Sequence, residues 1–316
     1  MKIRKITQKF FPRYAMLLSL TIILSVLVFG VNAFAETEDS TQSYETTDPF
    51  RYTVGEPVIR ERSDTEKQFF FYRDDIRIWG KLYLPEGEGP FPAVIMSSGY
   101  RARGTFNDKW AKQFAANGFA AVIFDFAGSS AGTQSGGNLT DLSVFSEAAD
   151  LNVVIDSLVA MPVIDKENIF LFGHSFGGLV SAYIGCSRPN DIQGMLLVEP
   201  SFQLKDAVMA DYPDLDQIPD VMYTPDFLGK IYFIDLYSFD IFDLMPSFQK
   251  DVLIFSATAP SSIGGSCPEY FSRAVETFPS AELVRVEGAD HPFQGEAGDT
   301  MMENAIEFLN RHIHQP

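Results

Sequence analysis

Apolar residues follow two different periods along this chain from about Phe50 onward. Short runs rich in β-branched and aromatic residues alternate with longer stretches in which apolar residues recur at every third or fourth position. The short runs predict strands, and the longer stretches predict helices. The predicted strands are Gln68–Tyr72, Ile76–Leu84, Ala93–Ser97, Ala120–Phe124, Ile169–Phe172, Met195–Val198, Val252–Phe255 and Glu282–Val286.

Helices with one apolar face are predicted between these strands. One covers Thr140–Ala160, and the last one presents Met302, Ile306, Leu309 and Ile313 on one face. Most of the later strands are nearly continuous apolar runs, which is typical of parallel strands covered on both faces by helices. We therefore predict an α/β fold with a mostly parallel sheet, in which ligands bind beyond the carboxyl ends of the strands.

One segment, Phe202–Gln249, interrupts the alternation. It lies between two predicted strands, is too long for a plain loop, and is too apolar for a linker. We predict that it forms a cap over the strand ends, with about half of its aromatic side chains in the core and half lining a pocket. Those aromatic residues are Phe202, Tyr212, Tyr223, Phe227, Tyr232, Phe233, Tyr237, Phe239, Phe242 and Phe248.

The amino terminus has the pattern of a secretory signal peptide. Met1–Arg13 carries basic residues and no acid, Ala15–Val31 is mostly apolar, and Ala33-Phe34-Ala35 fits a cleavage site before Glu36. We therefore predict that residues 1–35 are removed and that the protein is secreted or extracellular. The alternative is an uncleaved membrane anchor, although the apolar run is slightly short of the roughly 20 residues that a bilayer span needs.

Composition limits the remaining organisation and the partners. Residues 36–49 are mostly polar or acidic and predict a disordered linker, which leaves 50–316 as one folded domain. Removal of residues 1–35 takes away five of 24 basic and none of 42 acidic residues, so the formal charge becomes −23. Such a surface repels nucleic acid and anionic membranes. Cys186 and Cys267 fall at distant places in the predicted fold, so we expect two free thiols.

The strongest chemical signal is the stretch Gly173-His174-Ser175-Phe176-Gly177-Gly178. It follows the predicted strand Ile169–Phe172 and precedes a helix-compatible run. This is G-x-S-x-G in the strand–turn–helix setting where small flanking residues let a strained turn expose the serine hydroxyl. The pattern predicts that Ser175 is a nucleophile.

A serine nucleophile needs a base, and the chain has four histidines. His174 is expected to point elsewhere on the sharp turn, and His312 and His314 fall on the last helix or its tail. His291 follows the last predicted strand, so it lies at the catalytic edge of the sheet and keeps the chain order in which serine precedes histidine. We predict that His291 is the general base.

The oxyanion of an acyl-transfer intermediate needs two backbone N–H donors. One is expected from Phe176, directly after the nucleophile. The other is expected from Tyr100, in the turn after the strand Ala93–Ser97, where Gly99 permits close approach of the backbone.

With these residues placed, residues 66–312 resemble the α/β-hydrolase superfamily, and more narrowly its cinnamoyl and feruloyl esterases with their acyl-peptidase-like relatives. The serine and histidine stretches are specific in combination, and the resemblance implies that the cap contributes to an aromatic acyl pocket. The matching stretches are Ser98-Gly99-Tyr100, Phe124–Gly128, Gly173–Gly178, the cap position after Val198, and Glu287–Phe293. At the first of these stretches the family has His-Gly-Phe.

The acid of the catalytic triad departs from that resemblance. Relatives carry an aspartate a few residues past the strand that matches Val252–Phe255, whereas Ser256–Ser262 contains no carboxylate. We predict that Glu199 replaces it, because Glu199 follows a neighbouring strand at the same edge of the sheet and keeps the order nucleophile, acid, base.

Alternatives to Glu199 remain open at this stage. Asp290 is adjacent to His291 in sequence and cannot easily turn its carboxylate back toward the imidazole. If Glu199 only bonds the backbone turn before Pro200, a Ser–His dyad is left.

The predicted function is hydrolysis of small-molecule carboxylic esters through an acyl-enzyme on Ser175, with no cofactor, because the chain has no metal constellation, P-loop or dinucleotide fingerprint. The alternatives are a peptidase or thioesterase on the same machinery, and a binding protein that kept the fold after losing its acid. The oligomeric state is left open.

Overall fold

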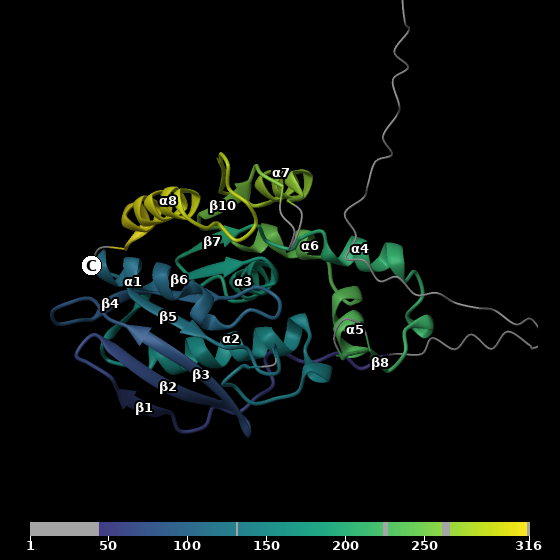
Figure 1. Ribbon diagram of the computed structural model, residues 1–316, viewed down its shortest axis with the longest axis horizontal. Helices are drawn as coiled ribbons and strands as arrows, with labels where there is room; N and C mark the ends of the chain where they lie inside the picture. The colour runs from purple at the N-terminus through teal and green to yellow at the C-terminus, as the bar shows by residue number, and fades with distance from the viewer. Residues whose placement is uncertain (1–43, 131, 224–226, 261–265, 315–316) are drawn as a thin grey trace, which may run out of the picture.

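The computed structural model describes residues 44–130, 132–223, 227–260 and 266–314. The predicted signal peptide lies outside these residues. The core is a nine-stranded sheet in the order β1-β2-β3-β5-β4-β6-β7-β10-β11 (Figure 1). Its strands are β1 (Val58–Glu61), β2 (Glu66–Arg73), β3 (Ile76–Tyr83), β4 (Phe91–Ser97), β5 (Ala120–Phe124), β6 (Ile164–His174), β7 (Gly194–Val198), β10 (Val252–Ala257) and β11 (Ala281–Val286).

The pairing of the strands confirms the predicted fold class. Strands β5, β4, β6, β7, β10 and β11 pair in parallel, and the β1–β2–β3 meander joins β5 antiparallel. All eight predicted strands are present, with ends that differ by a few residues. β1 was not predicted, because all four of its residues are exposed and an edge strand with no buried face has no apolar period.

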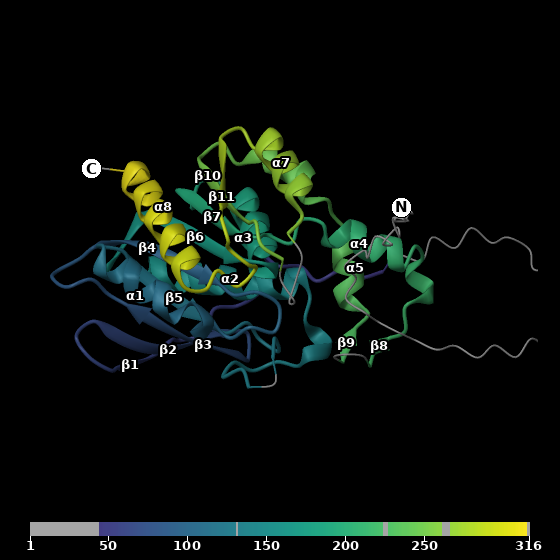
Figure 2. The ribbon, with the colours of Figure 1, turned by 45° about the horizontal axis from the view of Figure 1, so that its top comes forward.

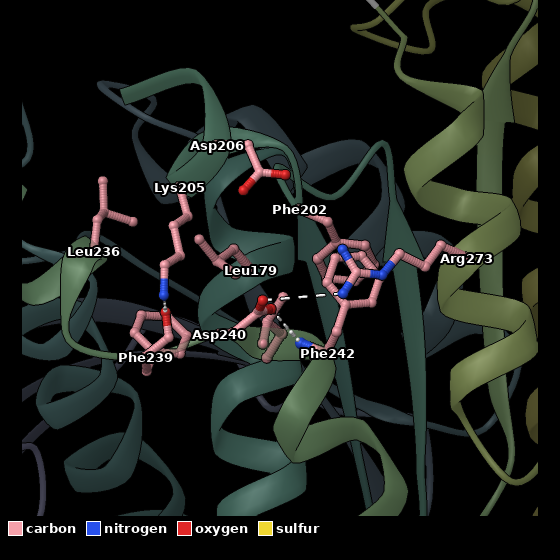
Figure 3. Close-up of a pocket in the computed structure, with 10 residues that line it drawn as sticks. Leu179, Phe202, Lys205, Asp206, Leu236, Phe239, Asp240, Phe242 and Arg273 are labelled. Atoms are coloured by element: carbon pink, nitrogen blue, oxygen red, sulfur yellow. Dashed lines mark hydrogen bonds and ion pairs between the residues drawn. The ribbon is translucent and has the colours of Figure 1, made fainter. Parts of the chain in front are cut away.

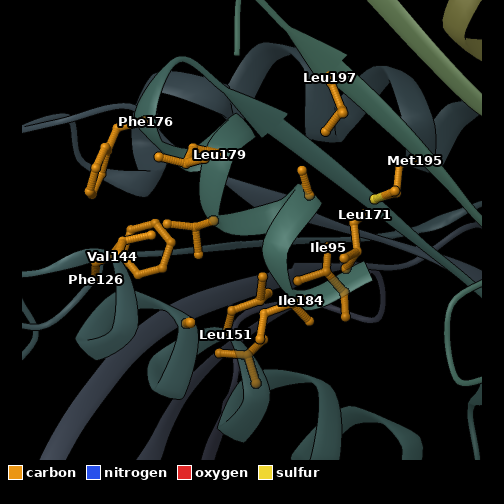
Figure 4. Packing of buried hydrophobic residues seen from close by; sticks show 14 of the residues in the cluster. Ile95, Phe126, Val144, Leu151, Leu171, Phe176, Leu179, Ile184, Met195 and Leu197 are labelled. Atoms are coloured by element: carbon orange, nitrogen blue, oxygen red, sulfur yellow. The ribbon is translucent and has the colours of Figure 1, made fainter. Parts of the chain in front are cut away.

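Helices cover both faces of the sheet, because successive strand side chains point to opposite sides. Ile95 in β4 packs in the core cluster with α2 and α3, whereas its neighbours Val94 and Met96 pack in the opposite cluster with α1 and α8. Figure 4 shows part of the first cluster between α2, α3 and the sheet. The helices are α1 (Asp108–Ala116), α2 (Val144–Val159), α3 (Phe176–Ser187), α7 (Pro268–Thr277) and α8 (Glu296–His312).

Helix α2 begins at Val144, four residues later than the sequence pattern indicates. Ser143 is its N-cap: the Ser143 hydroxyl accepts from the N–H of Ser146, and the Ser146 hydroxyl accepts from the N–H of Ser143. Such a reciprocal cap satisfies two N–H groups that the first turn leaves open. Residues Leu139–Asp141 form a separate short turn instead.

The segment between β7 and β10 folds as a group of short elements beside the strand ends (Figures 1 and 2). The predicted even division of its aromatic side chains between core and pocket is wrong, because Tyr223 and Phe227 are exposed to solvent, whereas Phe202 and Phe242 belong to the core and also line a pocket. The elements are α4 (Leu204–Asp211), β8 (Val221–Met222), β9 (Leu228–Gly229), α5 (Ile231–Tyr237) and α6 (Ile241–Leu244), with short turns at Leu215–Gln217 and Met245–Ser247.

The end of the predicted linker is attached to the domain, which corrects the expectation for residues 44–49. The Tyr44 hydroxyl donates to Asp216, and the Thr47 N–H donates to Oδ1 of Asp235 at 3.0 Å. The carbonyl of buried Pro49 accepts from Asn152 at 2.9 Å. The linker prediction overlooked these residues because their partners come from the cap and from α2, far away in sequence.

Two further observations concern the described residues. Cys186 in α3 and Cys267, the N-cap of α7, are not joined in a disulfide, as expected. None of the described helices is long and apolar enough to cross a membrane.

Candidate active site

The turn between β6 and α3 places Ser175 in a strained conformation. β6 ends at His174, α3 begins at Phe176, and Ser175 between them has φ 56° and ψ −120°. A non-glycine residue in this region is strained, and such strain gathers at functional sites. The Ser175 N–H donates to the carbonyl of Val198 at 2.8 Å, which holds the turn against the end of β7.

Two glycines allow this turn to pack closely against the end of β4. A Cβ atom on Gly177 would lie 2.4 Å from the carbonyl oxygen of Ser98. A Cβ atom on Gly99 would lie 3.0 Å from Cβ of Ser175. Larger residues at these two positions would push the serine turn away from the loop after β4, where the second oxyanion donor is expected.

Glu199 lies directly after β7 and is buried, with 3% of its surface exposed. Its φ of 47° lies in the left-handed region, and its N–H donates to the carbonyl of Phe255 in β10 at 2.9 Å. Carboxylate oxygen Oε1 accepts from the N–H of Ala257 at 2.6 Å and from the Ser266 hydroxyl at 2.9 Å. These two donors hold the carboxylate in one orientation.

The second oxygen of Glu199 faces the predicted base. Oε2 lies 3.5 Å from Nδ1 of His291, and the His291 side chain is itself mostly buried. This separation is an ion-pair distance and is longer than an ordinary hydrogen bond. The structure therefore brings Glu199 and His291 together as the sequence argument expected.

Ser266 and Ala257 are the residues that sequence reasoning missed. They lie in and after the region where relatives carry an aspartate, and here they supply hydrogen-bond donors to an acid from the next strand. No local pattern marks them, because a serine hydroxyl and a backbone N–H are common to all loops.

The predicted oxyanion donors lie next to an aromatic side chain from the cap. Phe176 is the first residue of α3, so its N–H has no acceptor within the helix. The rings of Tyr100 and Phe176 are 6.4 Å apart, and the ring of Tyr232 from α5 lies 6.3 Å from Tyr100 and 5.8 Å from Phe176. The cap thus contacts the side chains of both predicted donors.

His174 faces His291 more directly than the sequence indicated. Its Nε2 lies 2.8 Å from the main-chain carbonyl oxygen of His291, and the two rings are 5.0 Å apart. Burial, and then the proximity of His291, lower the pKa of His174 to about 4. His174 is therefore neutral at physiological pH.

A small pocket separates the start of α3 from the cap (Figure 3). Its volume of about 10 Å³ holds about one water molecule. Arg273 of α7 stacks on the ring of Phe242, and Lys205 donates to the carbonyl of Phe239 at 2.6 Å. The pocket is lined by Leu179, Phe202, Lys205, Asp206, Leu236, Phe239, Asp240, Ile241, Phe242 and Arg273.

A second hydroxyl lies beside the predicted nucleophile. Oγ of Ser201 is 3.5 Å from Oγ of Ser175, and the Ser201 N–H donates to the carbonyl of Ser175 at 3.0 Å. Ser201 directly precedes Phe202, which lines the pocket.

Among the described residues, no group of three His, Cys, Asp or Glu side chains is arranged to hold a metal ion.

Solved structures share this arrangement of strands and helices. Est1E from Butyrivibrio proteoclasticus, solved with ferulic acid bound, matches with a TM-score of 0.69 at 19% identity, over 77% of this chain and 98% of Est1E. The chain has the α/β-hydrolase fold. Acetyl xylan esterase 1 from Thermoanaerobacterium sp. JW/SL YS485 matches with a TM-score of 0.59 at 18% identity, over 79% of this chain and 87% of that esterase.

Sequence comparisons match known hydrolases over part of the chain. The family model for serine aminopeptidases of group S33 matches residues 89–223, a stretch that contains Ser175 and Glu199 and ends before His291. Esterase FrsA from Escherichia coli (strain K12 / DH10B) is 27% identical over 146 residues, which are 46% of this chain and 33% of that esterase. The match thus spans about a third of the curated relative.

Proposed function

We propose that this α/β-hydrolase is a serine esterase that cleaves small carboxylic esters through an acyl-enzyme on Ser175. The observation that carries the proposal is the buried Glu199, whose oxygens face two fixed donors on one side and His291 on the other. A carboxylate held in this way orients an imidazole and stabilises the cation that forms when the imidazole accepts a proton. The strained turn at Ser175 supplies the nucleophile at the same edge of the sheet.

The proposed reaction has two halves. In the first, His291 takes the proton of Ser175 as Oγ attacks the ester carbonyl, and then gives it to the departing alcohol. In the second, His291 activates a water molecule that releases the acid from Ser175. In both halves the negative oxygen is stabilised by the backbone N–H groups of Phe176 and Tyr100.

The cap is proposed to set the acyl specificity. Tyr232 packs beside both oxyanion residues, and five of the ten residues that line the pocket at α3 are apolar cap side chains. Because this pocket has room for about one water molecule, we propose that the cap side chains move apart when an acyl group binds there. Est1E, whose structure holds ferulic acid, and acetyl xylan esterase 1 define the two ester classes to test first.

The test is reaction with a fluorophosphonate probe followed by an ester screen. Wild type is expected to be labelled at Ser175 and to hydrolyse aryl esters, short-chain esters or long-chain esters, while Ser175→Ala loses labelling and at least about 10⁴-fold in kcat. Ser201→Ala is the matched control, because its hydroxyl lies 3.5 Å from that of Ser175 and it should still be labelled. Labelling at Ser201, or substantial turnover by Ser175→Ala, contradicts the assignment.

A peptidase is the second candidate, since the matching family model is that of serine aminopeptidases. The same purified protein is therefore assayed on aminoacyl anilides. Faster turnover of anilides than of esters would favour the peptidase. Absence of both activities together with absence of probe labelling would favour a binding protein on this fold.

Secretion is proposed from the sequence alone. The basic start, the apolar run and Ala33-Phe34-Ala35 support cleavage before Glu36. Amino-terminal sequencing of protein from the native host is expected to begin near Glu36. Recovery of Met1 or Lys2 would overturn the proposal.

A further inference from the structure

We propose that His174 is a positioning residue for catalysis: it holds the backbone of His291 so that the imidazole stays aligned between Glu199 and Ser175. The inference rests on the proposed function, because it assigns a task within that site. His174 itself does not touch the reacting atoms in this scheme. It acts through a hydrogen bond to the main chain of the base.

The contact determines which nitrogen of His174 carries the proton. Nε2 lies 2.8 Å from the carbonyl oxygen of His291, and a carbonyl oxygen only accepts hydrogen bonds. Nε2 must therefore carry the hydrogen and donate it. In the neutral ring this leaves Nδ1 without a hydrogen.

The topology explains why the loop of His291 needs an anchor at the serine turn. His291 follows β11 and Ser175 follows β6, and β7 and β10 lie between these two strands in the sheet. The loop must therefore cross three strand spacings, about 14 Å, to reach the serine turn, where its contact with His174 lies. His174 is the last residue of β6, directly before Ser175, and lies where this crossing ends.

Within the loop, the Phe293 N–H donates to the carbonyl of Asp290 at 3.0 Å, and the bonds that join the loop to the segment after β10 lie closer to its origin. The carbonyl of Ala289 accepts from the N–H groups of Thr258 at 3.1 Å and Ala259 at 2.8 Å, just after β10. The N–H of Gly288 donates to the Thr258 hydroxyl at 2.9 Å. These bonds fix the loop two residues before His291, and the bond from His174 fixes the carbonyl of His291 itself.

The surroundings of His174 are unfavourable for a polar side chain without a task. The residue is 5% exposed, and its ring stacks on Phe106 at 5.3 Å. Nδ1 has no hydrogen-bond partner among the described residues, and a Cβ atom built on Gly99 would lie only 3.4 Å from it. Leaving a buried acceptor unpaired costs about 1–3 kcal/mol. A phenylalanine side chain would fill the same space without that loss. The property that distinguishes His174 from phenylalanine here is the hydrogen bond that Nε2 donates.

The experiment compares three substitutions at His174. His174→Phe keeps the stacking ring and removes the donor. His174→Gln places an amide N–H about as far from the backbone as Nε2, and His174→Asn is the matched polar control whose amide reaches only as far as Nδ1. We expect kcat for the best ester to fall on the order of 10- to 100-fold in the Phe and Asn variants, with KM nearly unchanged, because misplacement of a catalytic group by about 1 Å can cost 100-fold. The Gln variant should recover most of this loss.

Melting temperature separates positioning from a packing role. All three variants are expected to fold, and the Phe variant should melt within a few degrees of wild type. If kcat follows the melting temperature across the series, or if His174→Gln is no better than His174→Phe, the proposal is wrong. Wild-type turnover by His174→Phe would also overturn it.

Hydrogen–deuterium exchange distinguishes this inference from the proposed function. In His174→Phe, the peptide that covers residues 287–294 should exchange faster than in wild type and in His174→Gln, whether or not the protein turns over an ester. Unchanged exchange there contradicts the positioning role. Faster exchange combined with an unlabelled wild-type Ser175 would sustain the anchor and reject the esterase.

Discussion

Two glutamates are buried to nearly the same extent in this protein and have opposite surroundings. Glu199, at the end of β7, receives hydrogen bonds from Ala257 and Ser266 and faces His291. Glu147, near the start of α2, has no hydrogen-bond partner for either carboxylate oxygen among the described residues. Burial, and then the neighbouring carboxylate of Asp150, raise the pKa of Glu147 well above its usual value.

The difference shows what burial by itself does to a carboxyl group. For Glu147, loss of water favours the neutral acid, and no hydrogen-bond donor among the described residues opposes that shift. At the end of β7, by contrast, two donors contact the Glu199 carboxylate. Asp150, one turn later in the same helix, forms an ion pair with Arg73 at 2.6 Å. The lack of a partner is therefore a feature of Glu147 and not of every acid in α2.

The largest effect that tests this comparison concerns activity. Glu199→Gln should lower kcat on the order of 10³- to 10⁴-fold, because a neutral amide cannot stabilise the imidazolium of His291. Glu147→Gln is the matched control and should leave kcat unchanged. Steady-state kinetics on one ester substrate decides the matter, and equal losses in both variants would mean that Glu199 has no special role.

The next effect concerns stability. Because the folded-state pKa of Glu147 is raised, its contribution to stability is fully present below its unfolded pKa near 4.5 and is lost as pH rises through the folded pKa. Glu147→Leu removes both the charge and the unpaired oxygens. It should therefore raise the free energy of unfolding by about 1–3 kcal/mol at neutral to alkaline pH, and by less at pH 4.

Urea unfolding of wild type, Glu147→Leu and Glu147→Gln between pH 4 and 8 measures that difference. The Gln variant should lose the pH dependence while keeping an unpaired polar group. A Leu variant that is less stable than wild type at pH 8 would show that Glu147 has a partner that stabilises its charge.

The smallest expected effect concerns the donors to Glu199. Ser266→Ala removes one of the two bonds to Oε1 and should lower kcat about fivefold to tenfold, the equivalent of one ordinary hydrogen bond, because the N–H of Ala257 still holds the same oxygen. Ser266→Thr keeps the hydroxyl and should stay close to wild type. If the alanine and threonine variants behave alike, the hydroxyl does not orient the carboxylate.

The local pattern of apolar residues was sufficient to predict the strands that are buried on both faces. β5, β7 and β10 are buried on both faces, so they appear as continuous apolar runs whatever their neighbours are. β1 has no buried face, and residues 44–49 are polar, so both went unpredicted although both make specific pairings. Pairings of this kind depend on partners far away in the chain, which a local period does not record.

The same division holds in the candidate site. The turn at Ser175 was predictable because its glycines and its place between a strand and a helix are local, and Glu199 and His291 were predictable because both follow strands that end at one edge of the sheet. The partners of these residues were not. Ala257 and Ser266 lie 58 and 67 positions from Glu199, and His174 lies 117 positions from His291.

By itself, the sequence determined that a parallel sheet forms, that a serine stands on a strained turn at its edge, and that an acid and a histidine end nearby strands. Only the tertiary structure decided which donors orient Glu199, which carbonyl His174 holds, and which buried glutamate is left unpaired. The physical reason is that periodicity and turn chemistry act between residues close in the chain. The hydrogen bonds of the site join residues far apart in the chain. They form only after the loop that follows β11 has crossed β10 and β7 in the folded protein.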